Sequence, residues 1–155
     1  MNTDSTLPAH AAHGRSTKSV ARILPVIARV LLGLMFVVVG LNGFLNFLPQ
    51  PSTPMPQGAL AFLGSLVRTG YLVPLLMGTQ ALVGALLVLN RFVPLALAVI
   101  APIVVNILAF HLFLDPREIG IAIIVLALEV YLTWAYRKAY RPMLAMRATP
   151  GARIL

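Results

Sequence analysis

The sequence predicts an all-α, polytopic membrane protein: an antiparallel bundle of four transmembrane helices with a short interfacial helix in its first outer loop. Hydrophobic residues make up 59% of the 155 residues and charged residues only 10%, against about 45–50% and about 25% in soluble domains. A soluble domain of this size could not bury so much apolar surface. In addition, four apolar segments each approach the ~20 residues that cross a bilayer as one helix.

These four segments are separated by links of very different length. They cover residues 23–48, 71–89, 92–114 and 119–136. Only Asn90 and Arg91 separate the second from the third, and residues 115–118 separate the third from the fourth. Such short links force neighbouring helices to run antiparallel. Residues 20–140 are therefore expected to form a single transmembrane domain.

The link between the first and second segments is longer and has two parts. Its first part, "PQPSTPMPQG", carries four prolines and cannot continue a helix. Apolar residues then recur at helical spacing at Ala59, Phe62, Leu63, Leu66 and Val67. This helix is too short to span the bilayer, so we expect it in the outer interface or dipping back into the bundle. It either seals the outer end by packing or forms a lid over a site between the spans.

Basic residues predict the orientation. With both termini in the cytoplasm, only Arg68 and Arg117 of the twelve basic residues fall on the outer side, as the positive-inside rule requires. Residues 1–19 are then a disordered cytoplasmic tail and residues 141–155 a basic cytoplasmic tail. The net charge of +8 indicates contact with anionic lipid rather than with nucleic acid. The bilayer is the predicted partner.

Several polar residues interrupt the outer halves of the spans. Counted at ~1.5 Å per residue, Asn42, Gln80 and Asn106 lie about 9–12 Å below the outer face, and His111 lies nearer the surface. They are candidates for one polar pocket between the helices. The alternative is that the amides only hydrogen-bond across neighbouring helices and hold them together. Small residues let transmembrane helices approach closely. Five glycines are therefore assigned to close helix packing: Gly33, Gly40, Gly43, Gly78 and Gly84.

Two opposite charges lie in the inner half of the bundle. Arg29 on the first span and Glu129 on the fourth fall at about 9 and 10 Å from the cytoplasmic face. Since an isolated charge at this depth is costly, we predict a buried ion pair that ties these two helices together. Its role is structural. Cysteine is absent, and no metal-binding or nucleophile motif occurs, so no metal site and no catalytic residue is predicted.

Two segments resemble a known family. "RVLLGLMFVVVGLNGF" and "TQALVGALLVLNRF" are similar to the first and second spans of the DoxX family of small bacterial membrane proteins. With the four spans and the long first loop, the resemblance covers residues 22–140. Many family members carry a lysine where this chain has Gly43 and a glutamate where it has Gln80.

The resemblance implies a multi-pass protein of the bacterial inner membrane. It also implies a subunit or accessory of a quinone-linked oxidoreductase, with quinone as the cofactor and a second membrane protein or another copy of the chain as partner. Two other functions stay open. The chain is either a non-catalytic structural or partner-binding protein, or a binder or transporter of a small apolar molecule. Without an acid/base pair or a metal motif, the isolated chain is expected not to be an enzyme.

Overall fold

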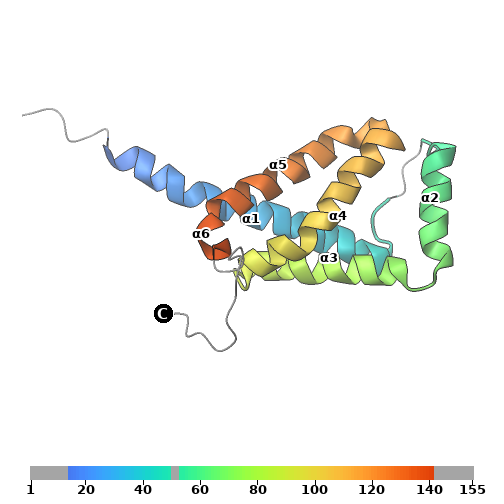
Figure 1. Cartoon of the computed structure of the whole chain (residues 1–155), viewed down its shortest axis with the longest axis horizontal. Coiled ribbons are helices and arrows are strands. Elements are labelled where there is room, and N and C mark those ends of the chain that lie inside the picture. The colour runs from blue at the N-terminus through green and yellow to red at the C-terminus, as the bar shows by residue number, and fades with distance from the viewer. Residues whose placement is uncertain (1–13, 50–52, 142–155) are drawn as a thin grey trace, which may run out of the picture.

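The computed structural model describes residues 14–49 and 53–141, and every regular element within them is helical (Figure 1). In chain order the elements are α1 (Gly14–Leu45), α2 (Gln57–Arg68), α3 (Leu72–Val88), α4 (Val93–Phe113), the 3₁₀ turn η1 (Pro116–Glu118), α5 (Ile119–Ala135) and α6 (Arg137–Tyr140). Long helices α1, α3, α4 and α5 lie lengthwise beside one another, whereas α2 stands across one end (Figure 1).

Helices α1 and α3 pack antiparallel and unusually close. A Cβ added to Gly84 of α3 would lie 2.6 Å from the backbone oxygen of Gly33 and 2.6 Å from the backbone nitrogen of Val37. Two turns along α1, a Cβ on Gly40 would clash with the backbone of Ala81. Small residues let transmembrane backbones approach in this way. The predicted packing role is therefore confirmed for Gly33, Gly40 and Gly84.

Two other glycines assigned to close packing have different surroundings. The three atoms nearest a Cβ on Gly43 would be Cγ, Sδ and Cβ of Met77, all of them side-chain atoms and all closer than 3.0 Å. One on Gly78 would meet the ring of Phe44 at 3.9 Å, an ordinary van der Waals distance. Gly78 lies on α3 like Gly84 but not at a backbone contact, so its predicted packing role is wrong.

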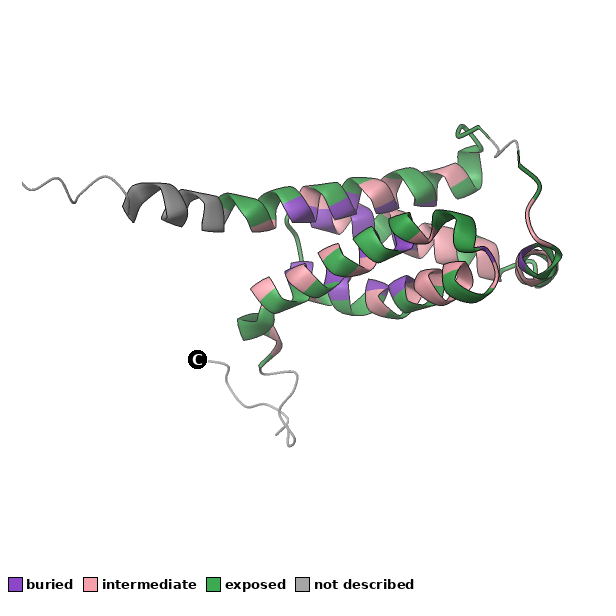
Figure 2. Ribbon diagram, turned by 90° about the horizontal axis from the view of Figure 1, so that it is seen from above, coloured by how far each residue is buried: buried purple, intermediate pink, exposed green. Residues whose placement is uncertain are grey.

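A compact apolar core lies where α1, α3, α4 and α5 meet. Its largest fully buried side chains are Leu32, Leu87, Leu97, Ile100, Leu132 and Val104. The outward faces of the helices are green, and thus exposed, along their length in Figure 2. Exposed residues on these faces include Leu82, Val105 and Ile124. An apolar exterior around an apolar core is expected of helices in lipid, where the solvent is itself apolar.

Three helical segments are long and apolar enough to cross a membrane: Ile23–Leu45, Val93–Phe113 and Pro116–Ala135. A fourth crossing results if Gln57–Arg68 and Leu72–Val88 are counted as one span, but these two helices meet at an angle of 93°. The structure thus has three or four candidate spans among its described residues, which agrees with a multi-pass membrane protein.

The predicted segments match α3, α4 and α5 to within one residue at each end. The first segment does not match as well, because α1 begins at Gly14. Residues 14–19, predicted as part of an unstructured tail, are helical instead. Residues 15–22, which precede the apolar segment, contain no proline or glycine. The helix therefore continues from the apolar segment back to Gly14. Residues 1–13 and 142–155, which hold the rest of the two predicted tails, lie outside the described residues.

Candidate functional site

A cavity of about 430 Å³ lies between α2, α3 and α4. Phe62, Leu63 and Leu66 of α2 cover it, and the rings of Phe62 and Phe110 lie 5.8 Å apart across the contact between α2 and α4. Most of the wall is apolar. Ligand cavities in proteins have this size and this character, with a few polar groups that orient the ligand.

Three of the four predicted pocket residues line this cavity: Gln80, Asn106 and His111. Gln80 is only 5% exposed, and its Oε1 has no hydrogen-bond partner within the described part of the chain. A buried, unsatisfied amide oxygen costs about 1–3 kcal/mol. The wall of the cavity therefore includes a residue whose buried amide oxygen has unused bonding capacity.

His111 contributes a second acceptor. Its Nδ1 lies 3.1 Å from the backbone oxygen of Asp115. A carbonyl oxygen only accepts, so Nδ1 carries the proton and Nε2 of the neutral ring is an acceptor. His111 and Asn106 are about 140° apart around an ideal helix. Both nevertheless line the cavity, because it extends along α4 from Pro102 to His111.

Asn42, the fourth predicted pocket residue, lies elsewhere. Its Oδ1 accepts a hydrogen bond of 2.7 Å from the backbone N–H of Leu48. Helix α1 ends at Leu45 and Asn46 adopts a left-handed conformation with φ of 48°, so Asn42 belongs to the last turn of the helix. Its side chain satisfies a backbone donor beyond the helix end instead of turning toward Gln80.

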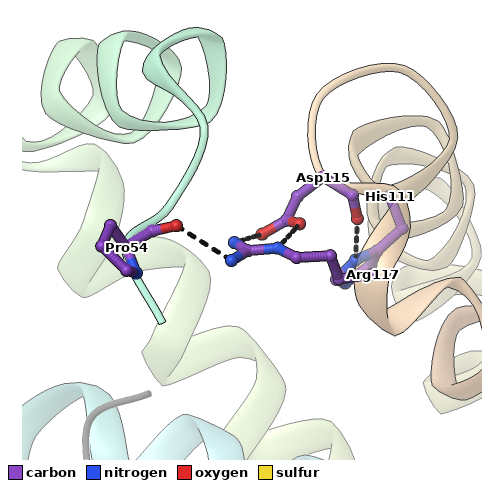
Figure 3. Close-up of polar contacts among 4 residues, drawn as sticks. All are labelled: Pro54, His111, Asp115 and Arg117. Atoms are coloured by element: carbon purple, nitrogen blue, oxygen red, sulfur yellow. Dashed lines mark hydrogen bonds and ion pairs between the residues drawn. The ribbon is translucent and has the colours of Figure 1, made fainter. Parts of the chain in front are cut away.

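A hydrogen-bonded cluster fastens the segment before α2 to the turn between α4 and α5 (Figure 3). Arg117 donates from Nε and NH2 to the two carboxylate oxygens of Asp115, at 2.6 and 2.7 Å, and from NH1 to the backbone oxygen of Pro54 at 2.9 Å. The hydrogen bonds from Arg117 hold the pKa of Asp115 below its ordinary value of 3.8, although burial acts in the opposite direction. We call this cluster the α2 latch.

The sequence analysis did not identify the α2 latch. Its one visible signal was a pair of opposite charges two residues apart, Asp115 and Arg117, in a short link. The third contact, to Pro54, joins residues 63 positions apart. Nothing in the local sequence indicates that contact.

Arg29 and Glu129 are both buried, at 6% and 4% exposure, but the structure does not pair them. NH1 of Arg29 donates to the backbone oxygens of Leu87 and, at 3.3 Å, of Val88. These carbonyls belong to the last turn of α3, whose oxygens have no partner inside their own helix and attract cations. Neither carboxylate oxygen of Glu129 has a hydrogen-bond partner among residues 14–49 and 53–141. The single ion pair of these residues is the one between Arg117 and Asp115.

No group of three or more histidine and acidic side chains that could hold a metal ion occurs within the described residues. The cavity beneath α2 instead offers apolar walls, two amides and an imidazole. Such a set can make apolar contacts and hydrogen bonds to the same small molecule.

Comparison of the chain with protein-family models, with curated proteins and with solved structures finds no match.

Proposed function

We propose that the chain is a four-span membrane protein that binds a small, largely apolar molecule bearing a hydroxyl group in the cavity beneath α2. The observation that carries this proposal is the buried Oε1 of Gln80, an acceptor without a partner among the described residues, in the wall of a cavity of about 430 Å³. A hydroxyl donor would satisfy this oxygen, and the apolar walls would hold the rest of the molecule.

A hydroquinone is the ligand class that fits both the chemistry of this cavity and the DoxX-like pattern of the first two spans. Its hydroxyl groups can donate to Gln80 Oε1 and to Nε2 of His111, and its ring suits a wall that contains Phe62 and Phe110. The oxidised quinone can accept from the amide nitrogen of Gln80. On this proposal the chain is a quinone-binding subunit or accessory of an inner-membrane oxidoreductase, and it supplies no catalytic group of its own.

The proposed arrangement in the membrane places α1, α3, α4 and α5 across the bilayer, both termini in the cytoplasm, and α2 flat in the outer interface. Its support is the distribution of basic residues, the antiparallel packing of α1 on α3, and the 93° angle between α2 and α3. Alkaline phosphatase fused after Tyr140 is expected to be inactive, and the same enzyme fused within residues 49–56 is expected to be active. The reverse pattern would contradict this orientation.

Ligand binding can be tested with two neighbouring residues of α3. Leu76 lines the cavity, whereas Leu75 is 60% exposed on the outer surface. Decylubiquinol added to the purified wild-type protein is expected to raise its melting temperature, because a ligand that binds only the folded state stabilises it, by about 2.7 kcal/mol at a hundred times Kd. Leu76→Phe, which fills the cavity, should abolish this increase, and Leu75→Phe should retain it.

Native mass spectrometry of the gently purified protein gives an independent test. A retained small molecule that is lost from Leu76→Phe would support the proposal. A retained protein chain without any small molecule, together with no stabilisation by decylubiquinol, would favour the structural or partner-binding function instead.

A further inference from the structure

A second cavity lies at the end of the bundle opposite α2. It is an open groove of about 590 Å³ between α4 and α5, and α6 lies at its mouth. Its wall is almost entirely apolar. The polar groups that line it are Glu129 and Thr133 of α5, Arg137 and Tyr140 of α6, and the indole of Trp134. We call it the α4–α5 groove.

Glu129 is a buried carboxyl group in this groove, and no contact among the described residues explains its burial. It is 4% exposed, and neither of its carboxylate oxygens has a hydrogen-bond partner within the part of the chain that the structure describes. Arg29, the cation predicted to pair with it, donates to backbone oxygens of α3. A carboxylate without a partner at membrane depth costs at least about 2.5–3.5 kcal/mol. A ligand that brings a positive charge into the groove would remove this cost.

Arg137 does not supply that charge. Its NH1 donates to the backbone oxygen of Trp134 at 3.0 Å, and its guanidinium lies 4.3 Å from the centre of the Trp134 ring. It is held at the mouth by these two contacts, and no ion pair joins it to Glu129 among the described residues. Because Arg137 is positively charged, it also disfavours approach of a cation from the aqueous side.

The side of the groove offers another route. Val105 of α4 and Val130 of α5 line it and are 60% and 59% exposed. In a membrane these faces would contact lipid. A molecule dissolved in the bilayer could therefore enter between α4 and α5 without passing Arg137.

Hydroxyl groups lie beside the carboxylate on the side of the mouth. The pKa of Tyr140 is raised, first by burial and then by the negative charge of Glu129, while a hydrogen bond with Thr133 lowers it. The Tyr140 hydroxyl donates to the backbone oxygen of Pro94 at 2.9 Å. The hydroxyl-bearing residues Thr133 and Tyr140 thus line one end of the groove, and the other end, around Leu126 and Val105, is apolar.

We propose that the α4–α5 groove binds a single-tailed amphiphilic ammonium ion from the lipid phase, with the ammonium group against Glu129 and the tail along the apolar wall. Charge complementarity selects this class of ligand, since a cation would stabilise the ionised form of the buried Glu129 carboxyl group, which has no hydrogen-bond partner among the described side chains. The two ends of the groove, polar at the mouth and apolar further in, fit a molecule with one charged head and one hydrocarbon tail.

Trp134 is the only tryptophan of the chain and lines this groove, so its fluorescence reports on occupancy directly. The protein in phosphatidylcholine vesicles is titrated with dodecyltrimethylammonium and with dodecyldimethylamine N-oxide, which has the same tail and a head of similar size without net charge. The cation is expected to change Trp134 emission at a concentration at least about tenfold lower than the N-oxide, the ratio that 1.4 kcal/mol produces. Glu129→Gln should make the two probes equal. Glu118→Gln, which removes an exposed carboxylate outside the groove, should leave the preference unchanged.

The comparison of the two probes on the wild-type protein does not depend on whether a variant folds. Equal responses to the cation and the N-oxide would overturn the proposal. So would a cation preference that persists in Glu129→Gln, because the positive charge would then be recognised elsewhere.

Discussion

Replacing Gly84 by alanine tests whether the backbone contact between α1 and α3 sets the packing of the bundle. The added Cβ would lie 2.6 Å from Gly33 O and 2.6 Å from Val37 N. An ordinary contact begins at 3.4 Å, so the two helices must separate by several tenths of an ångström. Both obstructing atoms belong to the backbone and cannot rotate away. Overpacking of this kind costs about 1–3 kcal/mol.

The matched control is Gly78→Ala on the same helix. A Cβ there meets only the Phe44 ring at 3.9 Å, so the substitution introduces no clash. Both variants gain the same intrinsic helix preference of alanine over glycine, up to about 1 kcal/mol, and the difference between them isolates the packing cost.

The measurement is the free energy of unfolding of the two variants in detergent micelles, followed by far-ultraviolet circular dichroism during denaturant titration. We expect Gly84→Ala to be less stable than Gly78→Ala by about 1–3 kcal/mol. Equal stabilities would refute the reasoning, because they would mean that α1 and α3 can separate at no cost.

Three further predictions concern the charged groups. Arg29→Gln is expected to lower the free energy of unfolding by about 1.5–3 kcal/mol, because hydrogen bonds from a charged donor to the last carbonyls of α3 are lost. If Arg29→Gln had no effect in a Glu129→Gln background, an interaction between Arg29 and Glu129 would be indicated instead. Arg117→Gln should break the α2 latch and increase trypsin cleavage at Arg68, at the end of α2, whereas Arg91→Gln should leave that cleavage unchanged. Because the folded-state pKa of Asp115 lies below 3.8, its contact with Arg117 contributes stability above that pH and loses it as the pH falls further; the protection of α2 amides, measured relative to their intrinsic exchange rates at each pH, should therefore fall below pH 3.8 in the wild type and fall less in Arg117→Gln.

The ends of α3, α4 and α5 were predictable because they depend on the local sequence alone. Long apolar runs interrupted by Asn90 and Arg91, or by the link of residues 115–118, leave little freedom in where α3, α4 and α5 begin and end. The prolines before α2 likewise determine where that helix can start, and it begins at Gln57, directly after Pro56. In these cases the residues that mark a helix end in the sequence are also the residues that physically end the helix.

The directions of the polar side chains were not predictable from depth. Arg29 and Glu129 were predicted at similar depth, yet Arg29 turns to the end of α3, whose last carbonyls need donors. Asn42 was assigned to the Gln80 layer by its depth, but the helix ends three residues later and its side chain bonds to Leu48. Depth along a span says at which level a side chain lies. Which partner it meets depends on helix rotation and on backbone groups at helix ends.

The cavity beneath α2 is lined by α2, α3 and α4 and not by α1, which packs closely on α3 through glycines. Gly33, Gly40 and Gly84 draw α1 and α3 together until their backbones touch, so little side-chain volume separates these two helices. Near its start, helix α4 contributes Val93, Ala96 and Leu97 to the buried core that it shares with α1, α3 and α5.

Further along α4, α2 bridges the remaining space above Gln80 and the α2 latch holds it there. The cavity beneath α2 thus exists because α2 occupies the place where α4 no longer covers α3. Loosening the latch should change access to Gln80 without changing the contact between α1 and α3, so the roof of the site and the scaffold of the bundle are stabilised by separate sets of residues.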